Sequence, residues 1–154
     1  MAKEIERKFV VSGNGWRRRA TRGKVIRQAY LAATDAMSLR VRTIGKTKAY
    51  LTIKGNRSGS VRSEFEYPIP FKDARALMKL RTGHLIKKRR HIIKAGKAHF
   101  EIDVFQGDHR GLVVAEVELS KPHARFERPE WLGKEVTDEE RYYNASLARA
   151  GFSG

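Results

Sequence analysis

Charged and apolar side chains alternate along several segments of this chain. In an extended strand, successive side chains point to opposite faces, so residues two apart share a face. In 37–44, Arg40 and Arg42 fall on one face while Leu39 and Val41 fall on the other. The same alternation predicts about eight strands. They are 3–11, 25–33, 37–44, 48–54, 61–69, 85–93, 98–105 and 112–119.

Two further segments have features of helices. Segment 71–82 carries apolar residues on one side at helical spacing, and Gly83 is expected to end it. Thr137-Asp138-Glu139-Glu140 has the form of a capping box, which predicts a C-terminal helix to about Ala150. A surface loop or short helix is expected at 12–24, a loop at 55–60, and a loop with a short helix at 120–133. No linker or repeat divides the chain, so 1–154 is interpreted as a single α+β domain.

Composition supports a folded protein rather than a disordered one. Hydrophobic residues make up 40% of 154 residues, and cysteine is absent. The lack of cysteine excludes disulfides, thiolate metal sites and a cysteine nucleophile. No apolar run has the length of a membrane span, and the N-terminus does not resemble a signal peptide. We therefore expect a cytoplasmic protein that does not bind in a membrane.

The chain is strongly basic, with 33 Lys and Arg against 17 Asp and Glu and a formal net charge of +16. Such an excess attracts phosphates and other polyanions. The five histidines have no metal-ligand spacing and are expected at surface or edge positions.

The charged strand faces repeatedly carry two side chains of the same sign. The acidic pairs are Glu4/Glu6, Glu64/Glu66, Glu101/Asp103 and Glu116/Glu118. The basic positions are Lys8, Arg40/Arg42, Lys54, Arg62 and Lys88/Arg90. An ordinary sheet with one solvated face explains one or two such strands. Repeated same-sign pairs are better explained if they face a ligand of opposite charge.

A closed antiparallel barrel with a charged lumen would bring these pairs together. Eight strands leave room for side chains and a small ligand, and the helices and loops would cover the apolar outer face. Arginine and lysine would then hold phosphoryl oxygens, while carboxylates would hold Mg²⁺ or Mn²⁺. The pattern therefore indicates a tunnel for a metal-bound polyphosphate.

Nearly the whole chain resembles the CYTH superfamily, the triphosphate tunnel metalloenzymes. Seven motifs occur in the family's order. They are Glu4-x-Glu6-x-Lys8, Arg40-x-Arg42, Thr52-Ile53-Lys54, Arg62-x-Glu64-x-Glu66, Lys88-x-Arg90, Glu101-x-Asp103 and Glu116-x-Glu118. The segment 131–144 is similar to the end of the small bacterial members. The motif Glu-x-Glu-x-Lys is weak alone, but the ordered set is specific.

The resemblance implies a role for each charged position. Metal ligands are implied at Glu4, Glu6, Glu116 and Glu118, with Asp103 and the Glu64/Glu66 pair as secondary candidates. Substrate contacts are implied at Lys8, Arg40, Arg42, Lys54, Arg62, Lys88 and Arg90. The group that takes the proton of the attacking water stays open among Lys88, Tyr30 and Glu64. In 87–90 either alternate pair could face the lumen. The family pattern favours Lys88 and Arg90, although His91 stands where an aromatic residue is usual.

The expected activity is metal-dependent hydrolysis of a triphosphate, with inorganic tripolyphosphate as the first choice. The alternatives within the superfamily are a nucleoside or thiamine triphosphatase and an adenylate cyclase, which would need a pocket for an organic group that Trp16 and 12–24 could supply. A non-catalytic polyphosphate- or RNA-binding module is the alternative from another class. The paired acids argue against it, and nucleic acid is not an expected partner. The oligomeric state stays open, with a homodimer as one option.

Overall fold

The computed structural model describes residues 3–58 and 61–152, with the side chains of Lys3, Glu4 and Arg57 left aside. Within these residues the strands form one antiparallel sheet. They are β1 (Lys3–Val11), β2 (Lys24–Ala33), β3 (Met37–Ile44), β4 (Lys48–Ser58), β5 (Val61–Pro68), β6 (Thr82–Ala95), β7 (Ala98–Gln106), β8 (Val113–Glu118) and β9 (Leu132–Glu135).

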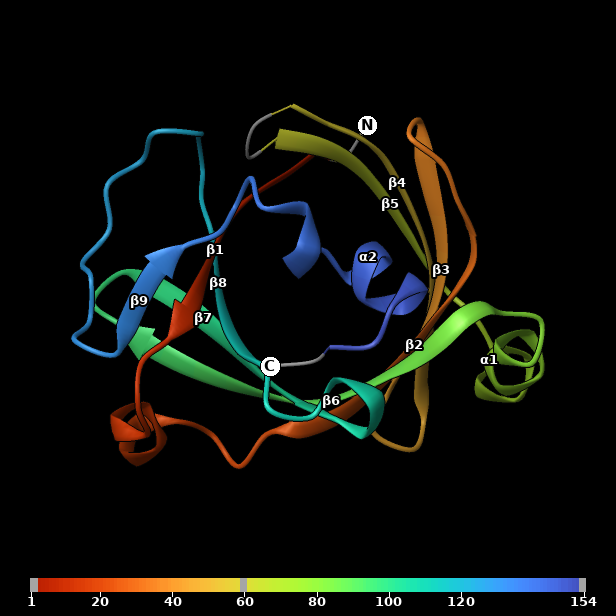
Figure 1. Ribbon diagram of the computed structural model, residues 1–154, viewed down its shortest axis with the longest axis horizontal. Helices are drawn as coiled ribbons and strands as arrows, with labels where there is room; N and C mark the ends of the chain where they lie inside the picture. Colours follow the sequence, from red (N-terminus) through yellow and green to blue (C-terminus); the bar gives the residue numbers. More distant parts are fainter. Residues whose placement is uncertain (1–2, 59–60, 153–154) are drawn as a thin grey trace.

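The sheet closes into a barrel. Its strand order is β5-β4-β3-β2-β6-β7-β8-β1-β9, and β5 also pairs with β1. The strands β1 to β8 therefore form a closed ring, and β9 is added outside it along β1 (Figure 1). This confirms the predicted eight-stranded barrel. Strand β9 was not predicted, because 120–133 was interpreted as loop and short helix.

The strand register directs the charged side chains to a common interior. Residues directly opposite on paired strands point to the same face of a sheet. Arg40 lies opposite Thr52, which lies opposite Glu66. On the other side of the barrel, Lys8 lies opposite Glu116, which lies opposite Glu101.

Helix α1 (Phe71–Met78) covers the outer face of β2, β3 and β4. Its buried residues Ala74 and Met78 pack against Ala29 and Val41. The amphipathic pattern had predicted this helix as far as residue 82. It ends earlier because Lys79 N donates to the Ala76 carbonyl, a tightened turn, and the chain enters β6 at 82.

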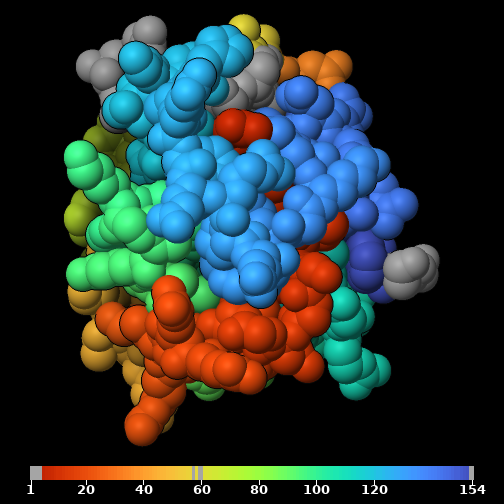
Figure 2. Space-filling view, turned by 90° about the vertical axis from the view of Figure 1, so that its left-hand side faces the viewer, coloured from red at the N-terminus to blue at the C-terminus, as the bar shows by residue number. Residues whose placement is uncertain are grey.

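A second apolar cluster covers the outside of β1, β7 and β8. Phe9, Phe100 and the 3-10 helix residue Trp16 are buried there, and Phe126 and Trp131 pack against them. The short helix η1 (Gly15–Arg19) supplies Trp16. Figure 2 shows the segment after β8 lying over this face beside the N-terminal segment. Trp16 is only 1% exposed, so it cannot form the organic pocket considered from the sequence.

The predicted capping box at Thr137 does not start a helix. Thr137 Oγ1 instead accepts from the Lys8 backbone N–H at 3.0 Å and donates to Glu135 Oε2 at 2.6 Å. A long-range partner therefore replaces the local one. Short helical turns follow as η3 (Glu140–Tyr142) and α2 (Asn144–Arg149).

Helix α2 lies within the opening of the barrel rather than on its outer face, where it was expected (Figure 1). Its Leu147 and Ala148 pack against Tyr30 and Ile86, which belong to the interior face. Gly83 permits this close approach, since a Cβ there would meet the Ala148 carbonyl oxygen at 2.2 Å. Gly83 is thus a residue of β6 and not the predicted helix stop.

Other boundaries differ modestly from those predicted. Strand β4 continues to Ser58, through part of the segment interpreted as a loop, and β6 runs from Thr82 to Ala95. A third 3-10 turn, η2 (Gly107–His109), follows β7. In the described part of the chain, no helix combines the length and apolar character needed to cross a membrane.

Candidate active site in the barrel lumen

Two connected cavities occupy the lumen. The larger, of about 490 Å³, opens at the end of the barrel beside α2, and the smaller, of about 190 Å³, lies deeper. They share Glu6, Arg40, Lys54 and Asn144 as lining residues. The rest of the smaller cavity is lined by charged groups only: Arg42, Glu64, Arg90, Glu101, Glu116 and Glu118.

One wall of the lumen is predominantly basic. Arg40 and Arg42 come from β3, Lys54 from β4 and Arg62 from β5, and each lines at least one cavity. Arg62 also donates to the Gly55 carbonyl at 3.3 Å. The structure brings these four predicted cations to a common wall.

The two arginines of β3 are constrained differently. Arg42 donates to Glu66 Oε2 at 2.9 Å. Burial and the positive charge of nearby Arg40 lower the pKa of Arg42. The buried Nε atoms of Arg40 and Arg42 have no hydrogen-bond partner among the described residues. Buried donors of this kind are costly unless a ligand or solvent satisfies them. They are suited to phosphoryl oxygens.

The opposite wall carries carboxylates in facing pairs. Glu6 of β1 lies directly opposite Glu118 of β8, and Glu101 of β7 lies directly opposite Glu116. Like charges in such positions destabilise a sheet unless a cation lies near them. Glu118 is the more exposed of the β8 pair, while Glu6 and Glu116 are buried.

Electrostatics distinguish Glu116 from its neighbour Glu101. Burial alone would raise the pKa of Glu116, but Lys8 and a hydrogen bond with Glu6 hold it well below its ordinary value. Lys8 Nζ lies 3.5 Å from Glu116 Oε1 and donates to the Tyr142 carbonyl at 3.0 Å. For Glu101, burial and the nearby Glu116 charge raise the pKa. The positive charge of Arg90 opposes this rise.

Asp103 has a different environment from these glutamates. Arg90 donates to both of its oxygens, at 2.8 and 2.9 Å, and Lys88 Nζ lies 2.8 Å from Oδ2. Burial would raise the pKa of Asp103, but the two cations lower it to about 2. Burial alone would lower the pKa of Arg90, but the carboxylates of Asp103 and Glu101 raise it. Asp103 was a secondary metal-ligand candidate, yet both its oxygens are engaged by protein cations.

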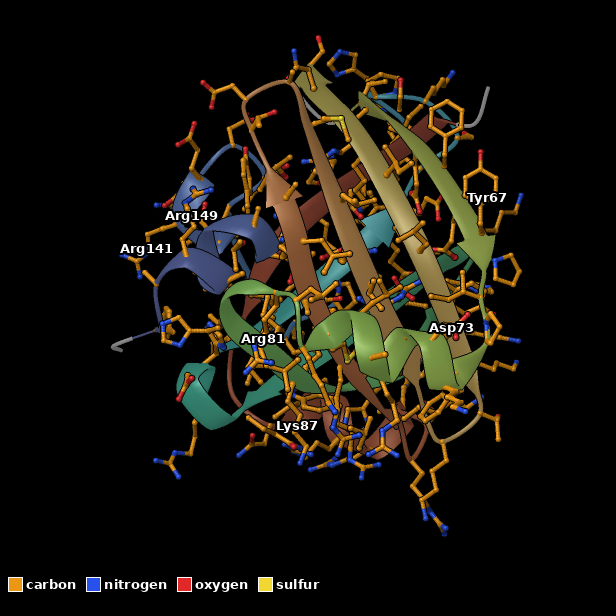
Figure 3. The ribbon with its side chains drawn as sticks, turned by 90° about the vertical axis from the view of Figure 1, so that its right-hand side faces the viewer. Tyr67, Asp73, Arg81, Lys87, Arg141 and Arg149 are labelled. Carbon is orange, nitrogen blue, oxygen red and sulfur yellow. The ribbon has the colours of Figure 1, made fainter. Side chains whose placement is uncertain are left out.

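Lys88 is on the inner side of β6, in agreement with the predicted register. It is 1% exposed, and burial lowers its pKa to about 8 although Asp103 opposes the shift. Lys87, its neighbour, projects outward from the barrel (Figure 3). Lys88 lines neither cavity, but its Nζ donates to Asn144 Oδ1 at 3.4 Å, and Asn144 lines both.

The other candidates for the proton acceptor have separate positions. Tyr30 is 5% exposed, lines the larger cavity and packs with α2. Glu64 lies opposite Lys54 and lines the smaller cavity. From the sequence, Tyr142 and Asn144 were expected only to hold the last helix against the barrel. Their contacts with the lumen lysines depend on where the C-terminal segment lies.

Oxygen donors are abundant, although the described side chains do not form a ready-made metal centre of three acids. The Glu4 side chain, a predicted ligand, lies outside the described residues, while its backbone pairs with Arg62. The donor chemistry of Glu6, Glu116 and Glu118 fits a hard divalent cation. The histidines do not contribute, and His109 is fully buried rather than at the surface, with its Nε2 against the Leu147 carbonyl.

Comparison with known proteins agrees with this geometry. The CYTH domain family matches residues 2–151. An inorganic triphosphatase of Acetivibrio thermocellus is 40% identical over 150 residues, covering 97% of this chain and 95% of that protein. An inorganic triphosphatase of Nitrosomonas europaea is 37% identical over 151 residues, covering 94% and 96%. The crystal structure of the inorganic triphosphatase NE1496 has a TM-score of 0.69 at 34% identity, covering 100% of this chain and 99% of that one. The closed barrel, the ordered charged pairs on its lumen and these similarities together show that the chain belongs to the CYTH domain family.

Proposed function

We propose that this protein is a divalent-metal-dependent hydrolase of inorganic tripolyphosphate. The observation that carries the proposal is the smaller cavity, where facing carboxylates oppose the basic wall of Arg40 and Arg42. A polyanion binder needs only the bases, whereas phosphoryl transfer needs bases and metal-binding acids together. The names of the two bacterial relatives support the same activity.

An inorganic substrate is favoured over an organic triphosphate. Trp16 lies in the outer apolar cluster, so it offers no face to a nucleobase or a thiamine ring at the tunnel mouth. The smaller cavity is lined by charged side chains and one amide, which is suited to phosphoryl groups throughout.

We assign the metal to Glu6, Glu116 and Glu118, together with Glu4. Mg²⁺ or Mn²⁺ at these acids would neutralise phosphoryl charge and lower the pKa of a bound water. Asp103 is better assigned to positioning Lys88 and Arg90, because all three groups are already paired.

The basic residues bind and orient the substrate. Arg40 and Arg42 can each grip phosphoryl oxygens through more than one N–H, and Lys54 and Arg62 add charge nearer the mouth. Lys8 is held between Glu116 and the Tyr142 carbonyl, at the boundary between acids and substrate. These groups align the triphosphate for attack at one end.

Lys88 is the preferred proton acceptor among the three candidates. A pKa of about 8 gives it a larger neutral fraction near neutral pH than an ordinary lysine has. The Asn144 side chain lines the cavity and accepts a hydrogen bond from Lys88, so it would orient Lys88 while a water carries the proton from the cavity. Tyr30 and Glu64 remain the alternative acceptors.

Phosphate release from tripolyphosphate, ATP, thiamine triphosphate and pyrophosphate, each with Mg²⁺ or Mn²⁺, tests the proposal. We expect the highest kcat/KM for tripolyphosphate and loss of turnover in EDTA that added metal restores. A higher kcat/KM for ATP or thiamine triphosphate would make that organic triphosphate the assigned substrate instead of tripolyphosphate. Turnover that persists in EDTA would contradict the metal mechanism, and a lack of turnover on all four would favour a binding module.

A further inference from the structure

A second basic surface lies on the outside of the barrel, away from the lumen. Lys87 of β6 points outward (Figure 3), and Arg27 of β2 lies directly opposite it and therefore shares its face. Arg89 is the next outward residue of β6, and its Nη1 donates to the Gly23 carbonyl at 3.2 Å, beside the exposed Arg22. We call Arg22, Arg27, Lys87 and Arg89 the basic face.

The basic face has no acidic neighbours within its own rows. Thr43 lies opposite Arg27, and Gln106 lies opposite Lys87, so the row across four strands contains two cations and two neutral residues. In the sequence, neither 9–34 nor 82–100 contains any Asp or Glu. Among the described residues, Arg27, Lys87 and Arg89 form no ion pair with a carboxylate.

The arrangement is unfavourable for an isolated sheet. Like charges directly opposite on paired strands repel, and surfaces normally intersperse the two signs. Figure 3 shows nitrogen-bearing side chains gathered around Lys87, whereas the labelled acid Asp73 lies at the far end of α1. An anionic partner with closely spaced charges would relieve this repulsion.

We propose that the basic face binds a linear inorganic polyphosphate chain outside the tunnel. The choice among polyanions rests on the burial of Trp16, the aromatic residue of the neighbouring η1. Single-stranded nucleic acids are held by aromatic side chains as well as by bases, but the nearby Trp16 is buried and is capped by Arg17, whose guanidinium lies 4.4 Å from the ring centroid. A membrane-binding surface would place exposed apolar residues beside the cations on the same face. Of the large exposed hydrophobic residues in the described chain, Met37 and Tyr67 belong to β3 and β5, Leu80 follows α1, and Ile92 alternates to the opposite face of β6 from Lys87 and Arg89.

Linear polyphosphate has the same chemistry as the proposed substrate, but its binding to the basic face does not require turnover. The face and the lumen are on opposite sides of the same wall, since Lys87 and Lys88 alternate along β6. A chain held outside would therefore occupy a site separate from the tunnel.

The test is fluorescence polarisation with labelled long-chain polyphosphate in EDTA, with excess tripolyphosphate present to fill the tunnel. The variant is Arg27→Glu with Lys87→Glu. The matched control is Lys72→Glu with Arg75→Glu, exposed positions of α1 that give the same change in net charge. Thermal unfolding of each variant checks the fold, and Arg27→Gln with Lys87→Gln replaces the first variant if it does not fold.

We expect at least tenfold weaker binding for the basic-face variant and less than twofold for the control. The slope of log affinity against log salt should fall by about 1 to 2 for the lost phosphate contacts. Both variants should hydrolyse tripolyphosphate as the unmodified protein does, which separates this inference from the proposed function.

Three outcomes would overturn the inference. Equal losses in both double variants would show attraction by net charge alone. Complete displacement by tripolyphosphate, together with unchanged affinity in the basic-face variant, would place the chain in the tunnel. Tighter binding of a charge-matched single-stranded RNA, or of phosphatidylserine vesicles, through the same residues would show that the partner is not polyphosphate.

Discussion

The Lys88 ammonium and the Asp103 carboxylate form an ion pair of 2.8 Å in which both side chains are 1% exposed. Arg90 holds the same carboxylate through two nitrogens. Removing one member of a buried ionic group leaves its partners charged in a poorly solvated place, which costs more than the pair itself contributes. This network therefore links the stability of the barrel to the protonation of a lumen lysine.

Replacing Asp103 by Asn should strongly destabilise the protein. The change leaves Lys88 and Arg90 without their shared carboxylate, so we expect a loss of about 3–5 kcal/mol in the free energy of unfolding. Urea unfolding measures it, with Asp35→Asn at an exposed turn as the control. A loss below about 1 kcal/mol would show that the cations find other partners.

Asp103 should also contribute to acid unfolding. Its pKa in the folded protein is about 2, below the ordinary value of 3.8, so its stabilising contribution is present above about pH 4 and is lost as pH falls towards 2. The unfolding free energy should therefore decline over that window, and less steeply in Asp103→Asn. Identical slopes in the two proteins would assign the acid sensitivity to other carboxyls.

Replacing Glu116 by Gln should abolish metal-dependent turnover in a protein that still folds, with some loss of stability because Lys8 loses a buried carboxylate partner. The glutamine keeps the size of the side chain but removes an anionic oxygen donor, so metal affinity should fall. Phosphate release at a series of Mg²⁺ concentrations measures the effect, and Glu130→Gln on the outer loop is the matched control. Full activity at ordinary Mg²⁺ would remove Glu116 from the metal site.

The lumen bases should separate into two kinetic classes. Arg42→Ala removes a contact made in both ground and transition states, so it should mainly raise KM, with about 1.5–3 kcal/mol lost in kcat/KM. Lys88→Ala should lower kcat much more than it raises KM, because a proton acceptor acts in the transition state.

Lys87→Ala is the control for the Lys88 variant, since the two lysines are neighbours on opposite faces of β6. It should leave both kinetic constants near their original values. A severe loss in Lys87→Ala with normal activity in Lys88→Ala would contradict both the assigned proton acceptor and the role of the lumen face.

Much of the barrel could be predicted from the sequence, because the two-residue alternation of a strand is a local property. The sharing of one face by Arg40 and Arg42, or by Glu116 and Glu118, follows from backbone geometry alone. Helix α1 was predicted for the same reason, since its apolar spacing is contained in eight residues. Lys88 was assigned to the lumen with the help of the family pattern, and its burial agrees.

The tertiary structure decided which local preferences prevailed. Thr137 was predicted to cap a helix through local contacts, but its hydroxyl instead accepts a hydrogen bond from the backbone N–H of Lys8. Asp103 looked like a metal ligand in its Glu-x-Asp motif, yet the register between β6 and β7 places Arg90 directly opposite it. The C-terminal helix entered the barrel because Gly83 leaves space and Tyr30 and Ile86 offer an apolar contact. The Thr137 and Gly83 contacts join residues far apart in the chain, and the Asp103 contact depends on the register of the β6–β7 hairpin, so the local alternation specifies none of them.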